Sequence, residues 1–211
     1  LEEQIKALGI KVCGKEFFPP AGELNVDMIE EGLSKTGCLT RKPRTVSLNS
    51  PLSVPPRPPI MCSACPHRGL FMALKKLDLI ISSDIGCYTL GALPPLNAMD
   101  SCICMGASIG NALGLDKVRQ NGKRVVAVIG DSTFLHSGMT GLLDIVYNKG
   151  TVTTIILDNR TTAMTGGQEH PGTGKTIQGH PTSRVDLVAL CKALGVEDVQ
   201  VVDPYDYEGT L

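Results

Sequence analysis

The chain has 211 residues, a formal net charge of −1 and an aromatic content of 4%, and this length fits one α/β domain with an additional segment. The near-neutral charge and scarce rings argue against nucleic acid or an anionic membrane surface as the main partner. No apolar run approaches the roughly 18 residues that cross a bilayer, and no signal-peptide pattern opens the chain, so we expect a cytoplasmic protein.

The first 59 residues are rich in proline and turn residues, in stretches such as FFPPAGELN and SPLSVPPRPPI. Because proline cannot continue a helix or a central strand, most of this segment is expected to run extended. The stretch NVDMIEEGLSKTG predicts one short helix that begins near Asn25 or Asp27. We interpret residues 1–59 as an interdomain arm or linker, and the abrupt opening LEEQIKALGIKV suggests that more protein precedes it.

From residue 60 onward, helix and strand patterns alternate. Helices are predicted at residues 66–77, 105–122, 135–150 and 183–195, and strands at residues 78–86, 123–132, 151–159 and 199–203. This alternation predicts an α/β domain over residues 60–211, with a parallel sheet flanked by helices. Ligands of such sheets bind beyond the carboxyl ends of the strands, where residues 86–87, 130–131 and 158–159 should collect.

Two consecutive predicted strands end on oxygen ligands. Asp131 offers a carboxylate and Asn159 a side-chain carbonyl, and both are donors suited to Mg²⁺ or Ca²⁺. Mg²⁺ usually takes one or two protein oxygens and completes its shell with substrate phosphates and water. Gly130 would let the backbone approach a phosphate, and the following helix start favours an anion. A Mg²⁺-bridged diphosphate therefore fits, although the same residues are also common in ordinary turns.

Several motifs resemble those of a known family. The sequence GDS at residues 130–132, followed after a 25-residue spacer by DN at 158–159, resembles the thiamine diphosphate motif of GDG followed by NN. The sequence MTGGQ at 164–168 is similar to a loop of the 2-oxoacid:ferredoxin oxidoreductases. The sequences CSAC at 62–65 and GC at 86–87 resemble further elements of that family.

Within that family, residues 55–205 resemble the large (alpha) subunit of the indolepyruvate ferredoxin oxidoreductases most closely. The segments that carry this resemblance are MCSACPHRG, SSDIGCYTLGALPPLNAMDSCICMGASIG and GDSTFLHSG. The resemblance implies a thiamine diphosphate-binding fold, and a fragment of a larger subunit that oxidatively decarboxylates aryl 2-oxoacids such as indolepyruvate to acyl-CoA. Implied partners are the other domains of the same subunit, a smaller second subunit, CoA and ferredoxin.

The resemblance also implies that the isolated chain is inactive. Thiamine enzymes need a carboxylic acid, normally a glutamate from a different domain, against the pyrimidine ring of the cofactor. No segment of this sequence resembles that domain, and no cysteine run of a ferredoxin module is present. The 4Fe–4S clusters that should carry the electrons are therefore expected in the full-length enzyme. Catalytic residues are not assigned.

Carried over residue by residue, the resemblance implies that Mg²⁺ is held by Asp131, the side chain of Asn159 and the backbone carbonyl of Thr161. The cofactor-binding residues that it implies are Gly86, Cys87, Gly130, Asp131, Ser132, Asn159, Thr161 and Thr165. Ser132 departs from the motif because it replaces the second glycine, so the turn must tolerate a Cβ atom. Leu90 stands where relatives acting on smaller oxoacids often carry lysine, which favours an aromatic oxoacid.

The paired cysteines allow three interpretations. Cys62, Cys65 and Cys87 match three of the four iron–sulfur ligands of some relatives. Zinc held by the first two together with Cys102 and Cys104 is an alternative, but a one-residue spacing is poor for a tetrahedral site. Reduced thiols without metal are favoured over both. The alternative function is accordingly a non-catalytic iron–sulfur or zinc module for electron transfer or scaffolding.

The sequence assigns no definite function to the four histidines. His136, His170 and His180 stand alone in the sequence and are assigned no role. His67 and Arg68 begin a predicted helix, where they would either contact a diphosphate or form a solvated first turn.

Overall fold

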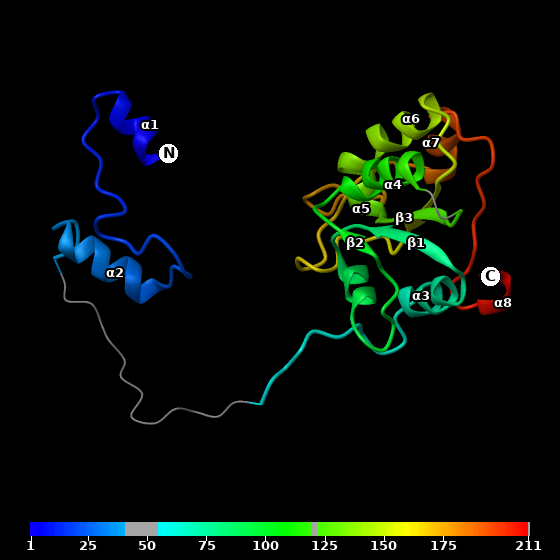
Figure 1. Cartoon of the computed structure of the whole chain (residues 1–211), viewed down its shortest axis with the longest axis horizontal. Coiled ribbons are helices and arrows are strands. Elements are labelled where there is room, and N and C mark those ends of the chain that lie inside the picture. Colours follow the sequence, from blue (N-terminus) through cyan, green and yellow to red (C-terminus); the bar gives the residue numbers. More distant parts are fainter. Residues whose placement is uncertain (41–54, 120–121, 211) are drawn as a thin grey trace. The chain divides into compact units, whose positions relative to one another are not determined.

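The computed structural model describes residues 1–40, 55–119 and 122–210. The chain forms two compact units, Leu1–Pro56 and Arg57–Leu211, so the border lies at residue 56 rather than at the predicted 59 (Figure 1). Residues 41–54 of the predicted proline-rich arm lie outside the described residues. Residues 55–60 form neither helix nor strand, which agrees with their proline content.

The first unit contains the helices α1 (Glu2–Ala7) and α2 (Val26–Lys35). The structure confirms the predicted helix as α2, and the side chain of Asn25 caps it by accepting a hydrogen bond from a backbone N–H three residues on. The expectation of extended backbone was wrong for α1. There, Lys6 pairs with Glu2 one turn earlier at 2.7 Å, a contact that supports an isolated helix.

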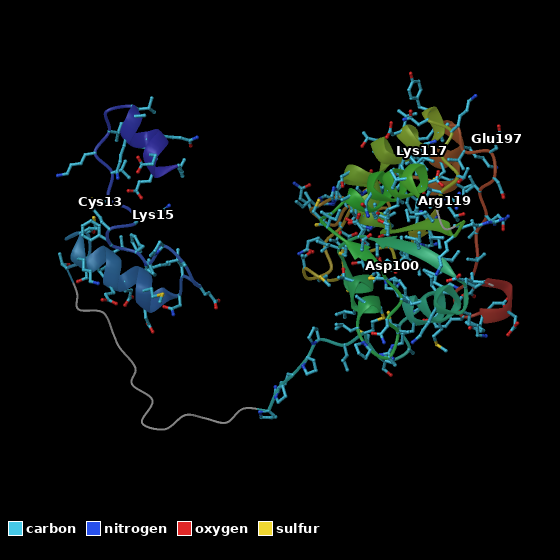
Figure 2. The ribbon with its side chains drawn as sticks, viewed as in Figure 1. Cys13, Lys15, Asp100, Lys117, Arg119 and Glu197 are labelled. Carbon is cyan, nitrogen blue, oxygen red and sulfur yellow. The ribbon has the colours of Figure 1, made fainter. Side chains whose placement is uncertain are left out.

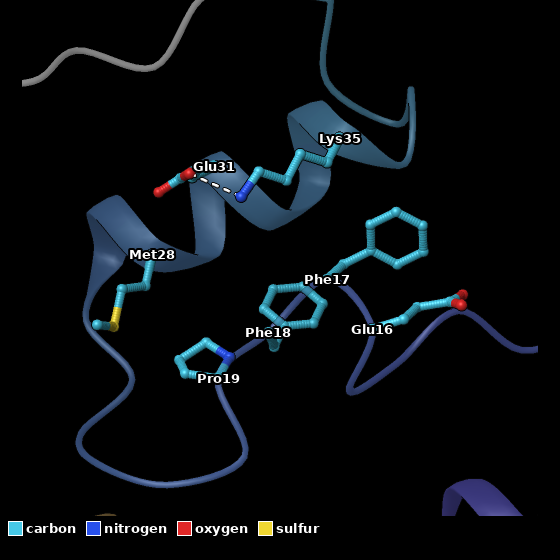
Figure 3. A pocket seen from close by; sticks show the side chains of 7 residues that line it. All are labelled: Glu16, Phe17, Phe18, Pro19, Met28, Glu31 and Lys35. Atoms are coloured by element: carbon cyan, nitrogen blue, oxygen red, sulfur yellow. Dashed lines mark ion pairs between the residues drawn. The ribbon is translucent and has the colours of Figure 1, made fainter.

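Figure 3 shows a pocket of about 390 Å³ in the first unit. Its lining comes from two segments of this unit and consists of Glu16, Phe17, Phe18, Pro19, Met28, Glu31 and Lys35. The ring of Phe18 packs against Gly32 of α2, where a Cβ atom would lie 2.3 Å from the ring. No predicted site residue lines this pocket, so the candidate site must be sought in the second unit.

The second unit is built on a parallel sheet with the strand order β2-β1-β3-β4. The strands are β1 (Leu79–Ser83), β2 (Ser101–Cys102), β3 (Arg124–Gly130) and β4 (Thr153–Leu157). This confirms the predicted parallel sheet. The chain leaves β1 toward β2 and later returns to place β3 on the other side of β1. The topological switch point, where ligands of such sheets bind, therefore lies between β1 and β3.

Helices and short turns cover both faces of this sheet (Figure 1). They are α3 (His67–Lys76), the 3₁₀ helix η1 (Cys87–Ala92), α4 (Ala107–Val118), α5 (Asp131–Thr133), the π-helical η2 (Phe134–Gly138), α6 (Met139–Tyr147), α7 (Leu187–Ala193) and α8 (Tyr207–Thr210). None of the helices in the described ranges is long and apolar enough to cross a bilayer. The order of elements confirms the predicted helix-flanked α/β domain.

Strand β3 is buried on both faces because each face has its own hydrophobic core. Val125 and Ile129 belong to the core under α4, α6 and α7. Val126 and Val128 belong to the core under α3 and η1. This double burial explains why the strand reads as an almost continuous apolar run in the sequence.

Some elements differ from their prediction. The helix after β3 begins at Asp131, directly at the strand end, rather than at residue 135. The predicted strand at residues 199–203 is not formed. Val199 packs against the core under α4, but Val201 is 80% exposed, so this apolar stretch is only partly used for packing. β2 and η1 are too short to give a periodic pattern and were not predicted.

Two side chains labelled in Figure 2 fix connections around the sheet. Asp100 accepts a hydrogen bond from the N–H of Ile81 at 2.7 Å, which ties the segment before β2 to β1. Arg119 lies 3.1 Å from the carboxylate of Asp116 and donates to the hydroxyl of Thr151 at 3.1 Å. The end of α4 is thereby fixed to the start of β4, the strand that leads into the candidate site.

Candidate functional site

Three strand ends meet at the carboxyl edge of the sheet. β1 and β3 pair in parallel up to Ser83 and Val128, and β3 and β4 pair up to Gly130 and Leu157. The segments that follow β1, β3 and β4 are those that contain the predicted cofactor ligands. The structure therefore brings these segments to one edge, which flanks the switch point between β1 and β3.

Asp131 is a buried carboxylate at this edge, with an exposed fraction of 2%. Its Oδ1 accepts a hydrogen bond from the N–H of Ser132, and its Oδ2 accepts one from the N–H of Arg160, each at 2.8 Å. Burial raises the pKa of Asp131, while these two amides and the nearby His170 lower it. The carboxylate is therefore enclosed by donors rather than open to solvent.

The turn after β4 lies against Asp131 through the amide of Arg160. Arg160 has a φ of +55°, a left-handed conformation that is uncommon for a residue other than glycine. Within the turn, the Oδ1 of Asn159 accepts a hydrogen bond from the N–H of Thr161 at 3.2 Å, and the Oδ1 of Asp158 accepts one from Arg160. Asn159 and Asp131 thus occupy adjoining turns, as the pattern of strand ends predicted.

Ser132 links the β3 turn to the loop beyond β4. It lies within α5, where a Cβ atom is accommodated, so its departure from glycine causes no conflict. Its hydroxyl accepts a hydrogen bond from the hydroxyl of Thr162 at 2.8 Å. Thr165 lies further out, exposed, with its hydroxyl bonded to the side chain of Gln168. The hydrogen bonds of Thr165 go to Gln168 and not to Asp131, so its cofactor role stays a prediction.

Tyr88 joins the β1 and β3 turns and was not expected from the sequence. A Cβ atom at Gly86 would lie 2.4 Å from the tyrosine ring, and one at Gly130 would lie 2.8 Å from it. The ring is buried, its hydroxyl donates to the carbonyl of Ile85 at 3.1 Å, and burial raises the pKa of Tyr88 to about 12. Both glycines are therefore explained by contact with this ring, whereas Gly130 was attributed to phosphate approach.

Asp84 is a second buried carboxylate, and it fixes β1 to the start of α4. Its Oδ1 accepts hydrogen bonds from the N–H groups of Ile85 and Gly106, and its Oδ2 accepts one from Ser108 at 3.1 Å. Gly106 has a φ of +87°, and a Cβ atom there would collide with Ser137. The amides at the start of α4 are therefore occupied by a protein carboxylate.

We expect Asp84→Ala to lower the free energy of unfolding by about 3 kcal/mol, because buried amides such as those of Gly106 and Ser108 lose their acceptor at about 1–3 kcal/mol each. Urea denaturation followed by circular dichroism measures this loss. Asp78→Ala is the matched control, since this exposed carboxylate pairs with Lys123 at the surface and should cost less than about 1 kcal/mol. Equal losses in the two variants would contradict the role of Asp84.

His170 lies against Asp131, although no role was predicted for it. Its side chain is 5% exposed, and its Nε2 is 3.3 Å from the Oδ2 of Asp131. Its Nδ1 accepts a hydrogen bond from the N–H of Gly172 at 3.1 Å. His136 and His180 are exposed. A single histidine in a glycine-rich loop has no periodicity or motif spacing, so the sequence contained no signal for this contact.

His67 and Arg68 do not form a solvated first turn. His67 is buried and packs edge-on against the ring of Tyr88, with the ring centres 6.1 Å apart, and burial lowers the pKa of His67. The guanidinium of Arg68 donates to the backbone carbonyls of Met61 and Cys62. Both side chains therefore fix the start of α3, and contact with a diphosphate stays a prediction.

The cysteines assigned to a cluster lie at the start of α3 and at η1. Cys62 is exposed and Cys65 is half-buried. Burial raises the pKa of Cys87, and the neighbouring thiols of Cys62 and Cys65 raise it further. Across the described ranges, no three His, Cys, Asp or Glu side chains come together as metal ligands. All eight cysteines are free thiols, so the iron–sulfur and zinc assignments stay predictions.

Comparison with known proteins identifies the family to which this chain belongs. Residues 84–210 match the protein-family model described as "Thiamine pyrophosphate enzyme, C-terminal TPP binding domain", in which thiamine pyrophosphate is thiamine diphosphate. The indolepyruvate oxidoreductase subunit IorA of Pyrococcus abyssi is 40% identical over 100% of this chain and 36% of its own length. That of Archaeoglobus fulgidus is 41% identical over 98% of this chain and 35% of its own. The chain thus spans little more than a third of these relatives.

Two solved structures share the fold of this chain. The 2-oxoglutarate:ferredoxin oxidoreductase of Magnetococcus marinus has a TM-score of 0.55 and 19% identity, covering 68% of this chain and 53% of that one. Benzoylformate decarboxylase of Polynucleobacter necessarius has a TM-score of 0.50 and 17% identity, covering 72% and 32%. At these low sequence identities, the structural similarity confirms the predicted fold alone. Membership of the family is shown by the match to the family model. The chain belongs to the thiamine pyrophosphate enzymes and contains their C-terminal thiamine pyrophosphate-binding domain.

Proposed function

We propose that this chain anchors thiamine diphosphate in an oxidoreductase that oxidatively decarboxylates aryl 2-oxoacids, such as indolepyruvate, to acyl-CoA, with ferredoxin as electron acceptor. The observation that carries this proposal is the buried carboxylate of Asp131, held against the Asn159 turn at the switch-point edge of the sheet. The names of the IorA relatives support the substrate and the assignment to a subunit.

The residues at this edge fit a magnesium ion. Asp131 Oδ1 and Asn159 Oδ1 each accept one backbone hydrogen bond, so each oxygen keeps a lone pair for a cation. Mg²⁺ needs only one or two protein side chains when phosphate oxygens complete its shell. The carbonyl of Thr161 would be the third protein ligand. The helical segment after β3 begins at Asp131, so its N-terminal end, which favours an anion, lies at the same edge.

When bound, thiamine diphosphate supplies the electron sink that allows a 2-oxoacid to lose CO₂. The residues of this chain position that group. Asp131 and Asn159 would hold the metal and thereby the diphosphate, and Tyr88 fixes the spacing of the β1 and β3 turns through its contacts with Gly86 and Gly130. The proposal includes 4Fe–4S clusters and ferredoxin, which would accept the electrons, and CoA, which would accept the acyl group.

The proposed setting is a complex with other domains of the same subunit and a smaller second subunit, because the relatives are named as subunits. A cytoplasmic location belongs to the proposal as well, supported by the free state of all eight cysteines. The alternative of an iron–sulfur or zinc scaffold is not favoured, since the family match lies over the thiamine pyrophosphate-binding domain.

Substrate preference tests the proposal. The assembled enzyme should reduce ferredoxin with indolepyruvate or phenylpyruvate and CoA. The kcat/KM for these substrates should be at least about tenfold above that for 2-oxoglutarate. The reason is that the second carboxylate of 2-oxoglutarate would lose its hydration on binding without gaining a cationic partner. Leu90, at the position where some relatives carry lysine, packs against the core under α3 and offers no charge. A preference for 2-oxoglutarate would contradict the proposed substrate and leave the cofactor site unaffected.

A further inference from the structure

We propose that His170 is a positioning residue that orients the Asp131 carboxylate for its metal ion, an inference that rests on the proposed function. The two side chains are 5% and 3% exposed, and His170 Nε2 lies 3.3 Å from Asp131 Oδ2. This is an ion-pair distance rather than a hydrogen bond, and Nε2 is a buried atom without a hydrogen-bond partner. Such an atom requires an explanation, because an unpaired buried polar group is costly.

The contacts of the ring determine which nitrogen faces the carboxylate. Nδ1 accepts the N–H of Gly172, so in the neutral imidazole the proton is on Nε2. A Cβ atom at residue 172 would lie 2.9 Å from the ring, and the backbone carbonyl of His170 accepts two hydrogen bonds from Thr173. The ring is therefore held from its backbone and from its Nδ1 side, with Nε2 at 3.3 Å from Asp131 Oδ2.

The two oxygens of Asp131 have different surroundings. Oδ2 accepts the amide of Arg160 at 2.8 Å and lies 3.3 Å from His170 Nε2. Oδ1 accepts only the amide of Ser132. The contacts of Oδ2 with Arg160 and His170 hold the plane of the carboxylate and leave a lone pair of Oδ1 for the cation. Contacts of this kind are often long before the ligand binds and tighten afterwards. Partners behind a metal ligand typically change metal affinity 10–100-fold.

Two variants of His170 separate positioning from simple packing. In His170→Gln, the amide nitrogen lies about as far from Cα as Nε2 does and can donate to Asp131. In His170→Asn, the shorter side chain reaches only the Nδ1 position, so it can accept the amide of Gly172 but cannot reach the carboxylate. The assembled enzyme, stripped of cofactor and metal, is titrated with thiamine diphosphate at increasing Mg²⁺ concentration in a calorimeter.

We expect His170→Asn to raise the Mg²⁺ concentration for half-maximal cofactor binding by about tenfold or more, and His170→Gln to stay within about threefold of the wild type. Melting temperatures measured without Mg²⁺ should differ little between the two variants. The same Mg²⁺ requirement in both variants would overturn the positioning role. If only the glutamine variant folds, a Mg²⁺ requirement equal to that of the wild type supports the positioning role, and a higher Mg²⁺ requirement overturns it. A wild-type enzyme that binds no thiamine diphosphate would instead overturn the proposed function, and this inference with it.

Discussion

Asp131→Ala is expected to abolish Mg²⁺-dependent binding of thiamine diphosphate by the assembled enzyme, with a loss of at least about a hundredfold in affinity. Asp131 is the charged ligand of the proposed metal site, and removal of one member of a buried charged pair costs about 3–5 kcal/mol, where each 1.4 kcal/mol is tenfold. Calorimetric titration with and without Mg²⁺ measures the effect. Undiminished binding by the alanine variant would contradict the metal assignment.

Stability must be separated from binding, because alanine leaves the amides of Ser132 and Arg160 without acceptors. Asp131→Asn removes the charge and keeps one acceptor oxygen, so only one of these two amides is left without an acceptor. Burial raises the pKa of Asp131 above its ordinary value of 3.8, so the carboxyl group holds its proton more tightly in the folded state than in the unfolded chain. The free energy of unfolding therefore falls as the pH rises above 3.8 and the buried carboxylate ionises. The asparagine variant should therefore melt above the alanine variant without metal, because it removes the buried charge and keeps one of the two hydrogen bonds, while its cofactor binding is lost.

Asp158→Asn is the matched control for both Asp131 variants. Asp158 is an exposed carboxylate in the same turn, and its Oδ1 makes only a 3.2 Å contact with the amide of Arg160. Its charge is accessible to water and screened by salt. We expect cofactor affinity within about twofold of the wild type. If Asp158→Asn lost as much cofactor affinity as Asp131→Asn, binding would depend on the total charge of the turn rather than on Asp131 as a metal ligand.

The placement of Asp131 and Asn159 at one edge of the sheet was predictable from the sequence because it depends on local patterns. The apolar run of β3 and the following Gly130-Asp131 identify a buried strand and its end without any knowledge of neighbours. The same holds for β4 and Asn159. Parallel strands then bring their carboxyl ends together by topology alone. Position along a strand is thus sufficient to place Asp131 and Asn159 at one edge.

The contacts that shape the site depend on tertiary packing and have no local pattern. Tyr88 lies in a 3₁₀ helix of six residues, and its importance arises from the two glycines that its ring touches, one of them on another strand. His170 contacts Asp131 across a loop whose glycines permit many paths. The stretch at residues 199–203 has the composition of a strand, yet a strand also needs a partner that sequence periodicity does not specify.

The 211-residue chain alone is expected to give no acyl-CoA. The chain spans 36% of the Pyrococcus abyssi relative, and its resemblance implies that the carboxylic acid for the pyrimidine ring comes from another domain. Among residues 1–40, 55–119 and 122–210, no glutamate is buried, so none has the enclosed setting that such an acid requires. A missing general acid or base alone lowers a rate by about 10²–10⁴-fold.

Cofactor binding by the chain alone should also be weak, with a Kd at least about tenfold above that of the assembled enzyme, because the loop around Met164 and Thr165 is exposed and must be ordered on binding. The assay mixes the purified chain with thiamine diphosphate, Mg²⁺, phenylpyruvate, CoA and an artificial electron acceptor. The assembled enzyme in the same mixture is the positive control. Sustained acyl-CoA formation by the chain alone would contradict this prediction, because it would show that its 211 residues contain the activating group.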